Sequence, residues 1–260
     1  MPFPSGWLVP DWPAPAHVRA VCTTRTGGIS QGAYESLNLG DHVGDSPEAV
    51  VRNRAMFAGA IDARPVFLQQ VHARRTVRLD ANTPDGTEAD GCFTTQRSVA
   101  CTIMVADCLP ILFTNTGGHA VAAAHAGWRG LAGEGGHGVI ESAWDAFRKA
   151  AHDCAIEASM TFVWLGPCIG PEAFEVGDEV KAAFEAHDAG AAPMFRPHAA
   201  TKWLADLQGL ARRRLHALGI TRIYGNDGTR EWCTVSNPSR FFSHRRDRVS
   251  GRFAASIWLD

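Results

Sequence analysis

Apolar and polar residues alternate in short blocks along most of the chain, a pattern that predicts many short strands mixed with helices. Strands are expected where apolar or β-branched residues run between turn residues, over 19–24, 65–71, 76–79, 99–105, 111–114, 120–124, 161–165, 222–224 and 253–259. Helical spacing or a start signal, such as Ser46-Pro47-Glu48, predicts helices over 46–59, 138–150, 177–187 and 202–218. Interspersed helices and hairpin-linked strands favour a mixed α/β domain over a pure βαβ winding.

Length and composition favour one sizeable domain. The chain has 260 residues, 45% of them hydrophobic and 20% charged, which suits a globular protein with a large core. Residues 1–18 are rich in proline and predict a lead-in segment, and 1–260 is otherwise interpreted as a single domain. No repeat or long linker interrupts it.

Net charge and cysteine content indicate which partners and which cellular location to expect. A formal net charge of −2 predicts no nucleic-acid partner, and the short apolar runs predict no membrane association. The N-terminus lacks a basic region followed by an apolar stretch, so a cytoplasmic location is expected. The seven cysteines contain no CxxC pair, which predicts free thiols rather than structural disulfides.

Three phrases place a metal-capable side chain where an apolar run ends. "VFLQQVH" ends at His72, "CTIMVADC" at Cys108 and "HAVAAAH" at His125. Two imidazoles and a thiolate are a ligand set that suits zinc, and three protein ligands leave a fourth position for water or substrate. The sequence therefore suggests a catalytic metal site at these strand ends.

The phrase "VADCLPILF" interrupts apolar residues with an acid, a thiol and a proline. The interpretation is that Cys108 must leave the strand ladder to face a partner and that Pro110 ends the pairing. Asp107 would then orient a ligand imidazole or a substrate hydroxyl.

A simpler interpretation stands beside the metal site. Single buried cysteines are usually inert, and lone histidines are usually satisfied polar residues. Thirty-six positions separate His72 from Cys108 and 17 separate Cys108 from His125, which matches no short zinc signature. The shared strand-end context, next to glycine and arginine, is what favours a site.

Several arginines lie beside glycines or at the start of a helical pattern, and arginine binds phosphate bidentately. Arg129 is the best candidate because it follows His125 by four positions; the others are Arg25, Arg54 and Arg245. Each of these four residues also fits the simpler interpretation of a solvated arginine on the protein surface. Trp128 suits stacking on a flat base, or simple core packing.

The ordered phrases "LQQVH", "ADCLPILF", "AAAHAGWRG", "LGPCIGPEAFEVG" and "FFSHRRD" resemble the peptidoglycan editing factor family, also called polyphenol oxidase or laccase-domain proteins. The resemblance runs from Thr23 to Trp258. It implies a layered α/β/β/α sandwich with mixed sheets. The sequence departs from the family at Glu172-Ala173-Phe174, where many members carry a cysteine and a tyrosine.

By this resemblance, His72, Cys108 and His125 are zinc ligands, and one zinc ion per chain is expected. From the residues themselves, Cys108, His125 and Asp107 are the predicted catalytic residues. Members of the family include zinc-dependent purine nucleoside phosphorylases. The implied reaction converts adenosine, inosine, guanosine or methylthioadenosine, with phosphate, to free base and ribose 1-phosphate, with adenosine deamination as a second activity. The implied partners are a small-molecule nucleoside and phosphate, and no oligomeric state is implied.

Three other functions are compatible with parts of the sequence. One is a cysteine hydrolase using Cys108, such as an amidase that edits peptidoglycan precursors. Another is a zinc-stabilised binding module without catalysis. The least favoured is a copper laccase, because several coppers require many imidazoles in tight pairs, and no His-x-His occurs here.

Overall fold

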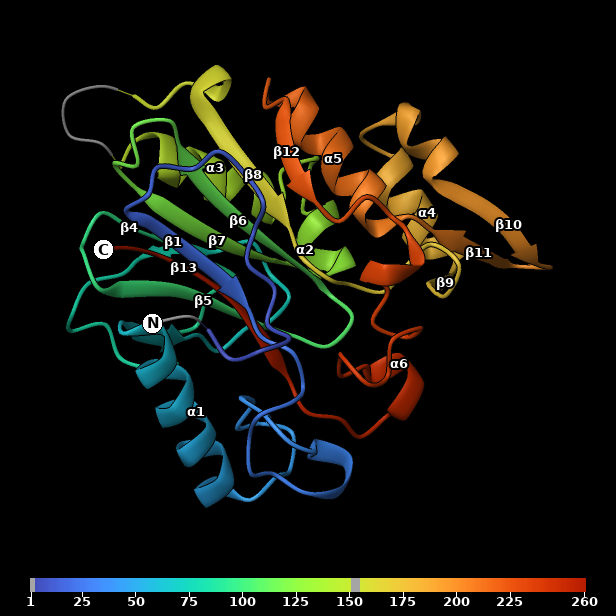
Figure 1. Ribbon diagram of the computed structural model, residues 1–260. Helices are drawn as coiled ribbons and strands as arrows, with labels where there is room; N and C mark the ends of the chain where they lie inside the picture. The colour runs from blue at the N-terminus through green and yellow to red at the C-terminus, as the bar shows by residue number, and fades with distance from the viewer. Residues whose placement is uncertain (1–2, 151–154) are drawn as a thin grey trace.

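Two β-sheets stack face to face, and helices cover both outer faces (Figure 1). This arrangement is the layered α/β/β/α sandwich that the family resemblance implies. The structure is a computed structural model and describes residues 3–150 and 155–260. One outer layer is helix α1 (Pro47–Ile61), and the other contains α3 (Val139–Arg148) and α5 (Leu207–Ala217).

The sheet beside α1 has four strands. Its order is β1 (Val18–Cys22), β13 (Phe253–Leu259), β5 (Val99–Val105) and β2 (Arg64–Phe67). The outermost pair, β2 and β5, is parallel, and the other two pairs are antiparallel.

The second sheet has six strands. Its order is β12 (Arg222–Gly225), β8 (Thr161–Leu165), β6 (Leu109–Asn115), β7 (Val121–Ala126), β4 (Gly91–Thr94) and β3 (Thr76–Arg78). The pairs at its two edges are parallel, and the central pairs are antiparallel. Both main sheets are therefore mixed, as the resemblance implies.

A small antiparallel sheet lies at one side of the molecule. Its strand order is β10 (Phe195–Ala199), β11 (Lys202–Ala205) and β9 (Glu175–Gly177). Helix α4 (Asp178–Glu185) directly follows β9 in the chain. The β10–β11 hairpin extends away from the two main sheets (Figure 1). Short helices complete the fold: α2 (Trp128–Ala132), α6 (His244–Asp247), and 3-10 turns at Gly32–Tyr34, Ala158–Met160, Ala189–Met194 and Arg230–Trp232.

Strand β5 shows how the sequence produces the layers. All seven of its residues are buried, because both of its faces are covered. Cys101, Ile103 and Val105 pack in the core between the two main sheets, whereas Ala100 and Met104 belong to the core under α1. Successive strand side chains point to opposite faces, so one largely apolar strand contributes side chains to two cores.

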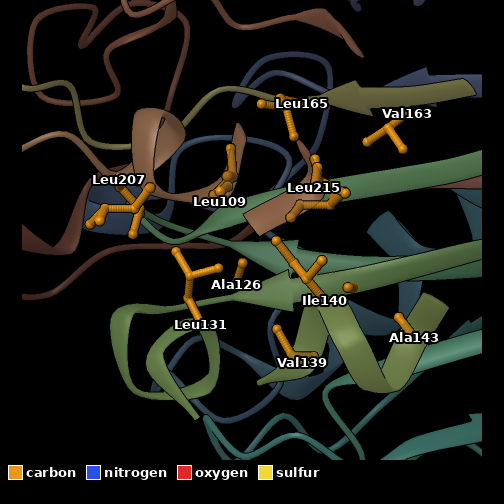
Figure 2. Close-up of a cluster of buried hydrophobic side chains, with 14 of the residues drawn as sticks. Leu109, Ala126, Leu131, Val139, Ile140, Ala143, Val163, Leu165, Leu207 and Leu215 are labelled. Carbon is orange, nitrogen blue, oxygen red and sulfur yellow. The ribbon is translucent and has the colours of Figure 1, made fainter. Parts of the chain in front are cut away.

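A third core fills the space between the six-stranded sheet and its helices. Figure 2 shows side chains from the strands, among them Leu109 and Val163, gathered with Ile140 and Leu215 from the helices. This core continues to α2, through Leu131. It therefore fixes the end of β7, from which the candidate site is built.

The interrupted phrase at 105–113 has a topological explanation. Strand β5 belongs to the four-stranded sheet and β6 to the six-stranded sheet, so Ala106-Asp107-Cys108 carries the chain from one sheet to the other. Asp107 has a φ of +88° at this crossover. The prediction that Pro110 ends the pairing is wrong, because Pro110 lies within β6 opposite His125 of β7. Its carbonyl accepts a hydrogen bond from Gly166 N at 2.9 Å.

The predicted helix over 202–218 is also wrong in its first part. Residues Lys202–Ala205 form β11, and Asp206 then caps α5 by accepting a hydrogen bond from Gly209 N at 2.7 Å. The apolar spacing continues through Leu204, but strand pairing with β9 and β10 decides its backbone. Strands β4, β9 and β10 and helices α2 and α6 were not predicted from the pattern.

Candidate metal centre and its cavity

The side chains of His72, Cys108 and His125 converge at one end of the stacked sheets. Their nearest ligand atoms all lie within 4.8 Å of one another. Cys108 Sγ is 3.7 Å from His72 Nε2, and the two imidazole rings are 4.7 Å apart in an edge-on arrangement. His125 is buried, Cys108 is half-buried and His72 is exposed. The sequence-based trio therefore meets in space.

The three residues reach the site from different parts of the fold. His72 lies in the loop after β2, five positions beyond the strand end, so the predicted strand over 65–71 is too long. Cys108 lies in the crossover between the sheets, and His125 lies within β7. The site thus spans both sheets, rather than one sheet edge as the strand-end argument assumes.

Asp90 holds this cluster together, and sequence reasoning missed it. Its side chain is fully buried directly before β4. Oδ1 accepts hydrogen bonds from His125 Nδ1 at 2.8 Å and His72 N at 2.9 Å, and Oδ2 accepts from Val71 N at 3.1 Å and Ala73 N at 2.8 Å. The sequence does carry one indication: an aspartate within the otherwise apolar phrase "ADGCF", where a surface acid is not expected.

The electrostatics of the cluster favour charged side chains. Burial alone would raise the pKa of the Cys108 thiol, but His125 and His72 outweigh it and lower that pKa to about 6. Burial alone would lower the pKa of His125, but the Cys108 thiolate and the Asp90 carboxylate raise it to about 9. Hydrogen bonds, first that from His125, likewise lower the pKa of Asp90 against its burial.

These residues fit a tetrahedral metal ion with nitrogen and sulfur ligands. An ion bound at about 2.0–2.3 Å sets such atoms roughly 3.5 Å apart, close to the observed 3.7 Å between Cys108 and His72. Gly127 leaves the necessary room, since a Cβ there would lie 2.8 Å from His72 Cδ2 and 3.1 Å from Cys108 Sγ. The donor set suits zinc or another borderline-soft ion.

A cavity of about 470 Å³ opens above the cluster, a size typical of small-molecule sites. Its walls combine the three candidate ligands with aromatic, aliphatic and basic side chains. The basic lining residues are His42, Arg129, His244, Arg245, Arg248 and Arg252. Asp107 is its acidic lining residue, so the walls suit an anionic ligand.

Two of the four candidate arginines line this cavity. Arg129 is exposed and lies over Trp128, with its guanidinium carbon 4.4 Å from the ring centre. Arg245 lies 5.7 Å from the ring centre of Phe174 and donates to the Glu175 carbonyl oxygen at 2.9 Å. Trp128 and Phe174 also line the cavity, so the Glu172-Ala173-Phe174 segment contributes one side chain to its wall.

The other two arginines have structural surroundings outside this cavity. Arg25 stacks on Phe242 at 4.6 Å and donates to the carbonyl oxygens of Glu35 and Pro238. Arg54 lies over Phe67 at 4.2 Å and pairs with Asp41 at 3.2 Å, beside a neighbouring cavity. The sequence-based preference for Arg129 over these two residues therefore agrees with the cavity lining.

Asp107 fixes the cavity wall and does not bind an imidazole. Its two carboxylate oxygens accept from Thr234 Oγ1 at 2.6 Å and from Arg245 N at 2.7 Å. Its carbonyl oxygen accepts from Ile169 N at 2.8 Å. The imidazole-orienting role predicted for Asp107 is filled by Asp90.

The remaining described cysteines lie away from the cluster. Cys22, Cys92, Cys101, Cys168 and Cys233 are buried free thiols. Burial raises the pKa of Cys22, Cys101 and Cys168, so these thiols stay protonated and unreactive. Cys154 lies outside the described residues.

Comparison with known proteins places the chain in a family. Residues 19–260 match the sequence profile of the family described as multi-copper polyphenol oxidoreductase laccase. The chain belongs to this family. The resemblance to laccase-domain proteins is thereby confirmed, and it covers both main sheets and the whole candidate site.

Individual relatives of this laccase-domain protein are similar over nearly their full length. A Pseudomonas aeruginosa protein named purine nucleoside phosphorylase is 47% identical over 98% of this chain and 99% of its own. Escherichia coli YfiH, with the same activity in its name, is 44% identical over 97% and 98%.

Solved structures share the fold. A Neisseria meningitidis protein superimposes with a TM-score of 0.90 at 44% identity, covering 98% of this chain and 100% of its own. YlmD from Geobacillus stearothermophilus gives a TM-score of 0.84 at 31% identity, covering 100% and 98%. Among the described residues, none of the helices is both long and apolar enough to cross a membrane.

Proposed function

We propose that this protein is a zinc-dependent purine nucleoside phosphorylase. The observation that carries the proposal is one cavity that combines a His72–Cys108–His125 ligand cluster with an aromatic and basic wall. The names of relatives that are 44–47% identical over almost the whole chain support it. The expected substrates are adenosine, inosine, guanosine and methylthioadenosine, each with inorganic phosphate.

In phosphorolysis, a phosphate oxygen attacks C1′ of the ribose, and the C1′–N9 bond breaks. The purine leaves with the bonding electron pair and gains a proton, while ribose 1-phosphate is released (5-methylthioribose 1-phosphate from methylthioadenosine). Arg129 and Arg245 would hold the phosphate, because a buried dianion is costly unless fixed cations meet it. Trp128 and Phe174 offer flat apolar surfaces for the purine.

His72, Cys108 and His125 would hold the zinc ion, which supplies Lewis-acid chemistry and a lowered pKa for bound water. Asp90 keeps His125 in place through the Nδ1 hydrogen bond. Adenosine deamination, which exchanges the 6-amino group for oxygen from water, would use the same cavity and needs no phosphate. We include it as a second activity.

A cysteine hydrolase is the second candidate, and a specific observation favours it. Cys108, His125 and Asp90 form the order of groups found in thiol-dependent acyl transfer: nucleophile, imidazole and orienting carboxylate. An amide of a peptidoglycan precursor is one candidate substrate. Metal content distinguishes the two functions, because a thiolate bound to zinc is a poorer nucleophile.

Copper oxidase chemistry, which the family's description mentions, is not part of the proposal. Within residues 3–150 and 155–260, the cluster at His72, Cys108 and His125 is the one group of three or more metal-capable side chains at this spacing. A multicopper oxidase needs several such groups. The proposed single ion is zinc, whose catalytic sites include three-ligand sets of nitrogen and sulfur donors, and metal analysis distinguishes it from a single copper.

The test is metal analysis of the purified protein, followed by incubation with adenosine, inosine, guanosine or methylthioadenosine. Each nucleoside is supplied with and without phosphate, and products are identified by mass spectrometry. We expect one zinc per chain, with free base and ribose 1-phosphate formed only when phosphate is present. Inosine formed from adenosine without phosphate would report deamination. A zinc-loaded, folded protein that releases no base from any of the four nucleosides contradicts the proposal.

A further inference from the structure

A single buried carboxylate contacts both histidines of the ligand cluster. Asp90 accepts three backbone N–H groups and one ring N–H, so all four hydrogen bonds run toward its oxygens. Neither face of this carboxylate is exposed to solvent. A carboxylate that is both ionised and buried requires such a full set of donors.

The backbone at His72 is shaped around this carboxylate. The N–H groups of Val71, His72 and Ala73 are consecutive and all point at Asp90, at 2.8–3.1 Å. Successive N–H groups that converge in this way form an anion-binding nest. His72 has a φ of +61°, a left-handed conformation that is costly for a non-glycine residue unless its surroundings fix it.

The ring of His125 is fixed by the same carboxylate. An ionised carboxylate can only accept, so Nδ1 of His125 donates its proton to Asp90 Oδ1 at 2.8 Å. Nε2 is then the nitrogen that is left for the thiolate or a metal ion. The contact therefore selects both the ring orientation and the coordinating nitrogen.

We propose that Asp90 is a positioning residue that sets the metal affinity of this protein, because it holds one ligand by its ring and another by its backbone. The inference rests on the proposed metal site, but not on the identity of the nucleoside. Loss of Asp90 would release the His72 loop and the His125 ring together.

The experiment compares Asp90→Asn with wild type and with Asp145→Asn. Asp145 is a suitable control because it also contacts a histidine, His137, at 3.5 Å, but lies on the surface of α3. Asparagine keeps the size of Asp90 but presents an amide N–H₂ to donors that need acceptors. The zinc dissociation constant is measured by chelator competition, and folding by circular dichroism.

We expect Asp90→Asn to raise the zinc dissociation constant by about 10- to 100-fold, and Asp145→Asn to leave it unchanged. A folded Asp90→Asn protein with wild-type affinity would overturn the inference while leaving the metal site standing. Wild-type protein that binds no zinc would overturn the site itself, before any variant is compared. Phosphorolysis is assayed separately, so its absence in zinc-loaded wild type counts only against the proposed reaction.

A second measurement needs no variant at residue 90, in case Asp90→Asn fails to fold. Nitrogen-15 NMR of the imidazoles in zinc-loaded wild type distinguishes a protonated from a metal-bound ring nitrogen, with His125→Gln identifying the signals. We expect Nδ1 of His125 to carry the proton and Nε2 to be the bound nitrogen. The opposite assignment would overturn the role of Asp90.

Discussion

The two walls of the cavity are built in different ways. The ligand wall, formed by His72, Cys108 and His125, is held by the buried Asp90 carboxylate through four hydrogen bonds. Gly127 packs so closely against this wall that a side chain would not fit there. The basic wall contains arginines that lie against aromatic rings, such as Arg129 on Trp128, at the edge of solvent. The comparison suggests that metal binding and phosphate binding are separable properties of one site.

The largest effect is expected at the centre of the ligand wall. Cys108→Ala removes the sulfur that lies 3.7 Å from His72 Nε2 and should lose most bound zinc, together with activity on every nucleoside. Metal analysis and the phosphorolysis assay measure both losses. Cys233→Ala, which alters a buried thiol outside the cluster, is the control for loss of a cysteine. Unchanged zinc in Cys108→Ala would remove the ligand assignment.

On the basic wall, Arg129→Ala should affect phosphate use and leave the metal in place. Truncating one charged contact costs a few kcal/mol, so phosphorolysis should slow by about ten- to a thousandfold. Deamination, which uses water, should decline less. Arg52→Ala, on the exposed surface of α1, is the matched control.

Two results for Arg129→Ala would break the comparison between the walls. Loss of zinc would mean that the walls are not independent. Equal loss of deamination and phosphorolysis, with zinc and fold intact, would make Arg129 a general substrate contact. The phosphate site would then move to Arg245, because Arg25 and Arg54 lie outside the cavity.

A smaller effect tests the tight packing of the ligand wall. Gly127 has a φ of −68°, which alanine adopts readily, so Gly127→Ala introduces only a steric conflict with His72 and Cys108. We expect its zinc affinity to fall by about tenfold or more, within the range seen when ligand supports are removed. In Gly59→Ala on α1, the new Cβ meets no atom within 4 Å, and this control should keep wild-type affinity. Equal affinities in both variants would show that the wall can adjust.

The mildest test uses pH in the metal-free protein. Because the pKa of Cys108 is lowered to about 6, its thiolate persists at neutral pH and is lost only as the pH falls through 6. Alkylation by iodoacetamide should therefore rise by roughly tenfold from pH 5 to pH 7 and then level off. Stopped reactions followed by peptide mass spectrometry measure it, and Cys108→Ala should lack the fast phase. A rate that keeps rising through pH 8 contradicts the charged pair of Cys108 and His125.

The three metal-capable residues could be predicted from sequence because their residue types and neighbouring phrases are informative. Contacts between residues far apart in the chain could not be predicted in this way. His72, Cys108 and His125 are metal-capable types in recurring phrases, and β5, β8 and β13 have the predicted bounds because each is a largely apolar run. Asp90 was missed because its partners lie 17–35 positions away. No local pattern reports such contacts.

The arginines and strand β11 show the same limit. Arg25, Arg54 and Arg245 were equally ranked alternatives behind Arg129 in the sequence, and only the fold places Arg245 in the cavity and the other two outside it. Residues Lys202–Ala205 continue a helical spacing but pair as a strand, because partners from β9 and β10 decide the backbone. Phe174 lines the cavity as well, far along the chain from the three candidate ligands.

The crossover at Ala106-Asp107-Cys108 links the metal site to the stability of the fold. His72 follows a strand of one sheet, His125 lies in a strand of the other, and Cys108 sits in the segment that joins them. An ion held by all three residues would cross-link the two sheets of the sandwich. Whatever binds there is linked to the cohesion of the whole fold, because ligands that bind only the folded state stabilise it by mass action.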